Sequence, residues 1–106
     1  MSDTNFINSI VKILEIPNQI LLNKNLFTRF RVQLPQARGN KIINLTFWGN
    51  LADDVSKYYT INDYIIIEGY VSLRHEQLIK SQFLKKVEVT VLRVYPLLLN
   101  YDYFYK

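Results

Sequence analysis

Apolar and polar residues alternate with a period of two along several short segments of the chain. In residues 26–34, Phe30 and Val32 share one predicted face, while Arg29 and Arg31 share the other. This period is typical of a β-strand that has one buried and one exposed face. The pattern therefore predicts a protein built mainly of short strands.

Four other segments have strand character, with turn-forming residues between them. Gly69, inside one of these segments, indicates a bulge or a sharp bend. Turns are predicted at Lys24-Asn25 and Asn62-Asp63, and polar loops at residues 35–40 and 75–81. The predicted strands are residues 7–16, 26–34, 41–48, 64–74 and 83–95. In the last two, the predicted inward residues are Ile65, Ile67, Val71, Leu73, Val87, Val89 and Val91.

Between the third and the fourth strand the period changes to that of a helix. Leu51, Ala52 and Val55 recur at helical spacing within residues 51–59, and Asn50 is predicted to cap the helix, with Asp53 at its third position. Three strands, a short helix and two more strands match an all-β, five-stranded Greek-key OB-fold barrel. The predicted domain covers residues 1–96, and residues 97–106 form a short apolar and aromatic tail.

Composition narrows the function by exclusion. The 106 residues are 49% apolar, with no Cys and one His, which suits one folded domain. Disulfide frameworks and metal sites built from several Cys or His are excluded. No apolar run has the length of about 18 residues that a membrane helix needs, and no signal or transit peptide is recognised. With its carboxylates dispersed and His75 alone in a predicted loop, the chain is expected to be no enzyme and to use no cofactor, membrane or small-molecule substrate.

The positive charge is concentrated in one part of the chain. The net charge is only +4, yet residues 16–52 contain no acidic residue. A basic stripe of this kind favours a nucleic acid as partner; the alternative is a solvated charged face. The basic residues of this stretch are Lys24, Arg29, Arg31, Arg38 and Lys41.

Two aromatic residues fall on predicted polar faces. Trp48 shares a face with Asn44 and Thr46, and Phe27 shares one with Arg29 and Arg31. Stacking of a nucleobase on such a ring contributes about 1–3 kcal/mol with little sequence preference. Alternatively, Trp48 packs under the helix or in a subunit interface.

Two sequence runs resemble the bacterial-type single-stranded DNA-binding protein (SSB) family. The first is Trp48-Gly49-Asn50-Leu51-Ala52-Asp53, which matches an aromatic-Gly-x-Leu-Ala-acidic signature. The second spans residues 65–74, where Glu68-Gly69 lies between apolar residues and Arg74 ends the run. The resemblance implies an OB-fold and non-catalytic, sequence-independent binding of single-stranded DNA in replication, repair or recombination, by a homodimer or homotetramer.

The chain is also rich in residues with AT-rich codons, such as Ile, Asn, Lys, Phe and Tyr. In this it resembles the small SSB-like proteins of red-algal plastids and cyanobacteria. We therefore expect a plastid location, or a cytoplasmic one if the source is bacterial.

The resemblance also ranks the candidate site residues. It implies that Trp48 stacks on DNA and that Lys41 and Arg74 lie near the strand. Further stacking positions of the family correspond to Ile42 and Glu76, and its acidic tail is absent. An assembly subunit that lost most DNA affinity, or a binder of single-stranded RNA, therefore remain alternatives. The predicted nucleic-acid-binding residues are Phe27, Arg29, Arg31, Arg38, Lys41, Trp48, Tyr70 and Arg74.

Overall fold

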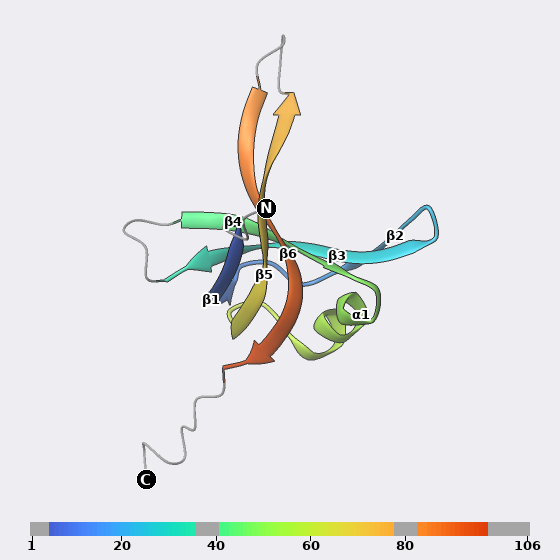
Figure 1. The fold of residues 1–106 in the computed structure, drawn as a ribbon. Coiled ribbons are helices and arrows are strands. Elements are labelled where there is room, and N and C mark those ends of the chain that lie inside the picture. The colour runs from blue at the N-terminus through green and yellow to red at the C-terminus, as the bar shows by residue number, and fades with distance from the viewer. Residues whose placement is uncertain (1–4, 36–40, 78–82, 98–106) are drawn as a thin grey trace.

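The computed structural model describes residues 5–35, 41–77 and 83–97, and within these ranges the side chains of residues 74–86 are left out of the description. Six strands and one helix make up the described chain (Figure 1). In chain order they are β1 (Phe6–Ile13), β2 (Gln19–Leu22), β3 (Asn25–Leu34), β4 (Lys41–Trp48), α1 (Gly49–Tyr58), β5 (Tyr64–Gln77) and β6 (Phe83–Pro96).

Five of the strands close into a barrel. The sheet runs in the order β1-β5-β6-β4-β3-β2, and β1 also pairs with β3, where Lys12 lies opposite Gln33. All pairs are antiparallel except β4 with β6, in which Leu45 lies opposite Val89. A closed five-stranded barrel with one helix between its third and fourth strands is the OB-fold, so the predicted fold class is confirmed.

The strand β2 was not predicted, and it extends the barrel as an outer hairpin with β3. All four of its residues are exposed, so the chain shows no alternation there. Asn23 and Lys24 have φ angles of 51° and 66°, the left-handed pair that a two-residue hairpin turn of type I′ requires. The turn therefore lies one residue earlier than predicted.

The barrel interior is filled by the alternating apolar residues that the pattern predicted. Phe30 and Phe47 stack in it with their ring centroids 5.3 Å apart. The helix α1 adds Ala52 and Val55, and the hydroxyl of the buried Thr28 donates a hydrogen bond to the Ala52 carbonyl oxygen over 3.0 Å. The helix is thereby fixed against β3. The other fully buried residues of the hydrophobic core are Val11, Ile13, Val32, Leu45, Ile65, Ile67 and Val89.

The helix begins earlier than predicted. Trp48 occupies the N-cap position with extended backbone angles, and its side chain makes no capping hydrogen bond. Asn50 therefore lies inside the first turn rather than capping it, and Asp53 lies beyond that turn. Asp53 instead accepts hydrogen bonds from Gln19 Nε2 at 3.0 Å and from Lys57 Nζ at 2.8 Å, which ties β2 to α1.

The hairpin of β5 and β6 is bulged at its base. The register shifts between Glu68 and Gly69, as predicted, and a Cβ atom on Gly69 would collide with the Thr90 carbonyl oxygen. Beyond the bulge the two strands project out of the barrel (Figure 1).

The structure corrects three predictions, two of them in this projecting arm. Leu73 and Val87, which pair with each other, are 56% and 37% exposed rather than inward, because the arm has left the core. The strand β5 continues to Gln77, so the predicted loop 75–81 begins too early. The first strand was also predicted too long, since β1 ends at Ile13. The predicted loop 35–40 lies outside the described residues after position 35.

Candidate nucleic-acid interface

The outer face of β3 and β4 brings several predicted residues together. Alternation along each strand points Phe27, Arg29 and Arg31 outward on β3, and the register places Trp48 opposite Phe27 on β4. Thr46 and Asn44 follow on β4, opposite Arg29 and Arg31. We call this surface the β3–β4 face.

Trp48 is the exposed aromatic side chain of the β3–β4 face. It is 45% exposed, and its ring centroid lies 5.1 Å from that of Phe27 at a tilt of 40°. Phe27 itself is only 6% exposed, because Trp48, Ile20 of β2 and the guanidinium of Arg29 surround it; the Arg29 Cζ lies 5.3 Å from its centroid. Phe27 was predicted as a stacking residue on an open face, whereas in the structure its buried ring packs beside the ring of Trp48.

Both arginines of the face contact carboxylates. Arg29 Nε donates to Thr46 Oγ1 at 3.2 Å, and its guanidinium lies 3.7 Å from Glu88 Oε1. Arg31 Nε lies 3.1 Å from Glu15 Oε2, and the Arg31 backbone N–H donates to the other Glu15 oxygen at 2.7 Å. Segment 16–52 lacks acids, but the fold brings Glu15 and Glu88 to it. The sequence did not predict either ion pair. Glu15 follows β1 and lies outside the acid-free segment, and Glu88 is brought next to β4 only by the parallel pairing of β4 with β6.

The remaining predicted residues lie farther away or outside the described chain. Lys41 is exposed at the start of β4. Tyr70 is on the outer surface of β5, 47% exposed, with its ring edge-to-face against Phe6 at 5.6 Å. Tyr70 pairs with Thr90, so β6 separates it from β4. Arg38 lies outside the described residues, and only the backbone of Arg74, in β5, is described.

A groove opens beside Trp48, between the tip of the β2–β3 hairpin and the start of α1. Its volume is about 490 Å³. The Asp53 carboxylate lies on its wall, and the hydrogen bond from Lys57, followed by the one from Gln19, lowers the pKa of that group below its ordinary value of 3.8. The Asp53 carboxylate is therefore ionised at neutral pH, where it pairs with Lys57, and Lys24 adds a positive charge to the lining. Its lining residues are Lys24, Asn25, Leu26, Trp48, Gly49, Asn50 and Asp53.

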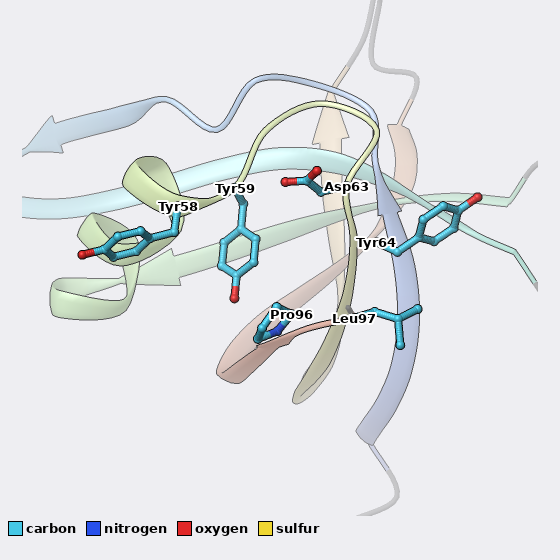
Figure 2. Close-up of a pocket in the computed structure, with 6 residues that line it drawn as sticks. All are labelled: Tyr58, Tyr59, Asp63, Tyr64, Pro96 and Leu97. Atoms are coloured by element: carbon cyan, nitrogen blue, oxygen red, sulfur yellow. The ribbon is translucent and has the colours of Figure 1, made fainter. Parts of the chain in front are cut away.

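A second, smaller cavity contains none of the predicted residues. Its volume is about 180 Å³, and it lies where α1 and β6 end and β5 begins. Figure 2 shows the ring of Tyr59 pointing toward Pro96, while Tyr58 points away. Burial, followed by the charges of Asp63 and Asp54, raises the pKa of the Tyr59 hydroxyl above 10.0. None of its described lining residues is cationic, whereas Lys24 lines the groove beside Trp48.

Among residues 5–35, 41–73 and 87–97, whose side chains are described, no three His, Cys, Asp or Glu side chains come together as possible metal ligands. Over the same ranges, no helix has the length and apolar character needed to span a bilayer.

An OB-fold whose β3–β4 face carries an exposed aromatic and basic side chains has the architecture of domains that bind oligonucleotides. No family model matches the sequence. A relative from Trieres chinensis, "Putative single-stranded DNA-binding protein ycf41", is 41% identical over 105 residues, covering 91% of each chain. The chain therefore belongs to the ycf41 family of SSB-like proteins, and the recognised resemblance is confirmed.

Solved structures of SSB proteins share the fold at lower identity. The small single-stranded DNA-binding protein of Streptomyces coelicolor has a TM-score of 0.75 at 15% identity, covering 88% of this chain and 94% of its own. The SSB domain of a Synechococcus sp. protein has a TM-score of 0.71 at 24% identity, covering 89% and 97%. SSBb of Mycobacterium smegmatis also has a TM-score of 0.71, at 22% identity, covering 87% of both chains. These matches support the barrel topology.

Proposed function

We propose that the protein is a non-catalytic binder of single-stranded DNA and that its β3–β4 face is the binding surface. The observation that carries the proposal is Trp48, half exposed beside Phe27 and next to Arg29, on the face that OB-folds use. A base stacks on the indole ring, and Arg29, Arg31 and Lys41 neutralise phosphates. The name of the Trieres chinensis relative supports this ligand. That name and the AT-rich composition also support a plastid location. Binding of single-stranded DNA would serve DNA replication, repair or recombination there.

Titration of the protein with oligo(dT) tests the proposal, with Trp48 fluorescence as the signal. We expect the emission to change on binding and the affinity to fall with salt, because phosphate contacts release counterions. Three described cations predict a slope of about −2 for log affinity against log salt, at about −0.7 per contact for a single strand. Unchanged emission and no binding at low salt would contradict the proposal and favour the assembly subunit. Tighter binding of oligo(U) would instead identify an RNA binder.

Replacement of Glu15 by glutamine is expected to strengthen DNA binding. The Glu15–Arg31 pair is exposed, with 41% and 56% of the two side chains accessible, so it contributes about 0.2–1 kcal/mol. The change frees the Arg31 guanidinium for a phosphate, while the amide oxygen still accepts from the Arg31 N–H. We expect an affinity gain of about twofold to fivefold at low salt, measured by anisotropy of a labelled oligonucleotide.

Asp54→Asn is the matched control, because it removes the same charge from an exposed position on α1. An equal gain in both variants would show that net charge alone is responsible, and the specific release of Arg31 would be refuted.

We further propose that the protein self-assembles through the outer surface of β1, β5 and β6. Four large apolar side chains there are 40–47% exposed, which is unusual for an unpartnered surface. They are Phe6, Ile10, Tyr70 and Tyr95. Light scattering is expected to show an oligomer, and Ile10→Glu to shift it toward the monomer, while Leu21→Glu on the remote β2 should leave it intact. A wild-type monomer at high concentration would exclude this interface.

A further inference from the structure

The groove beside Trp48 has the size and the position of a pocket for a single nucleotide. Its volume of about 490 Å³ lies within the range of about 300–1,000 Å³ that small-ligand sites occupy. It is lined on one side by Trp48, the exposed aromatic of the β3–β4 face, so a base that stacks on Trp48 lies at the mouth of the groove. It is therefore continuous with the proposed DNA surface.

The local backbone keeps this groove open. Gly49 has φ +63°, and no atom lies within 4 Å of the place where a Cβ would be, so the floor carries no side chain at that point. On the other wall, the left-handed turn at Asn23 and Lys24 reverses the hairpin. The hydrogen bond from Gln19 to Asp53 holds β2 at a fixed distance from α1. The groove is thus preformed.

The lining combines the groups that recognise a base edge. Trp48 and Leu26 supply apolar surface, and the amides of Asn25 and Asn50 can donate and accept hydrogen bonds. The Asp53 carboxylate only accepts. Each of its oxygens already accepts one hydrogen bond, from Gln19 or Lys57, and retains a second lone pair. Asp53 therefore offers an acceptor at this end of the groove to a donor group of a ligand.

Cytosine and thymine differ at this kind of site. Cytosine carries a 4-amino donor, whereas thymine has a 4-oxo acceptor at the same position. Because the two bases have similar size, the groove admits both, and only the former can donate to Asp53. A site built to accept a hydrogen bond discriminates against the analogue that cannot donate it.

We propose that the groove holds one nucleobase that has separated from its neighbouring bases, with its ring against Trp48 and its exocyclic amine donating to Asp53. The protein then prefers cytosine to thymine. This inference rests on the proposed function, since it concerns one base of a bound single strand. Stacking alone would bind all bases with little preference, and the hydrogen bond to Asp53 would add a preference for cytosine.

The test compares length-matched oligo(dC) and oligo(dT) at mildly alkaline pH, with anisotropy as readout. We expect oligo(dC) to bind about threefold to tenfold more tightly, the equivalent of one net hydrogen bond. Asp53→Ala, which removes the acceptor, should abolish the preference, and Asp54→Ala, on the neighbouring exposed residue, should keep it. Equal binding of both oligonucleotides by the wild type would overturn the groove assignment and leave the proposed function standing. Binding of neither would overturn the proposed function as well.

A second measurement avoids any change in folding. In the unmodified protein, the carboxyl carbon resonance of Asp53 is expected to shift on addition of oligo(dC) and to shift less with oligo(dT). Identical shifts with the two ligands, or loss of the preference in Asp53→Ala and Asp54→Ala alike, would overturn the inference.

Discussion

Gly69→Ala is expected to cost about 3 kcal/mol in the free energy of unfolding, at the upper end of what overpacking a tight contact costs. The new Cβ would collide with the carbonyl oxygen of Thr90 and crowd the Val91 Cα. These are backbone atoms of the neighbouring strand, so no rotamer change can relieve the contact. The bulge that lets the β5–β6 arm leave the barrel would have to open. Urea denaturation followed by circular dichroism measures the loss.

Gly49→Ala is the matched control for this prediction. Its φ of +63° strains an alanine, but the position has open space around it. We expect a loss of about 1–2 kcal/mol, the cost of the left-handed backbone alone. Equal losses at the two positions would show that the collision with Thr90 is readily relieved.

Trp48→Ala is expected to weaken single-stranded DNA binding about 5-fold to 150-fold, since a base–aromatic stack contributes about 1–3 kcal/mol. Trp48 is half exposed, so its loss should leave the barrel folded, as circular dichroism can verify. Because the variant lacks the fluorophore, binding is followed by anisotropy of a labelled oligo(dT).

Two further variants separate stacking from other effects of that change. Trp48→Phe keeps a ring and should retain most of the affinity. Tyr58→Ala removes a 74% exposed aromatic that does not line the groove, and it should bind normally. If Tyr58→Ala weakened binding as much as Trp48→Ala, the stacking role of Trp48 would be refuted.

The sequence pattern predicted those parts of the fold in which burial alternates strictly. The strand β4 has its predicted bounds, because Ile43, Leu45 and Phe47 all point into one core. The bulge at Gly69 was also predictable, because a glycine inside a strand indicates a close backbone approach. Asn62, in the predicted turn at Asn62-Asp63, has a φ of 73°, a left-handed conformation that asparagine tolerates. These two backbone positions were therefore predicted correctly.

The candidate site was less predictable, because its character depends on residues distant in sequence. Trp48 was placed correctly on an exposed face, yet the burial of Phe27 depends on β2, a strand with no periodic signal. The acid-free segment predicted unpaired arginines, whereas Glu15 and Glu88 reach them only in the folded barrel. Asn50 and Asp53 were read as capping residues, and the structure places them on the wall of a groove.

The way the barrel closes also bears on how the chain folds. The β2–β3 hairpin pairs residues that are close in sequence across a two-residue turn. The sheet becomes continuous only when Phe6 pairs with Tyr70 and Thr46 pairs with Thr90, residues that are far apart in sequence. Such distant pairings lose loop-closure entropy before they gain contact energy, so β-rich domains of this kind fold in about milliseconds to seconds. The β3–β4 face would then form early from adjacent strands, whereas Glu88, which neutralises Arg29, would arrive only with the final parallel pairing.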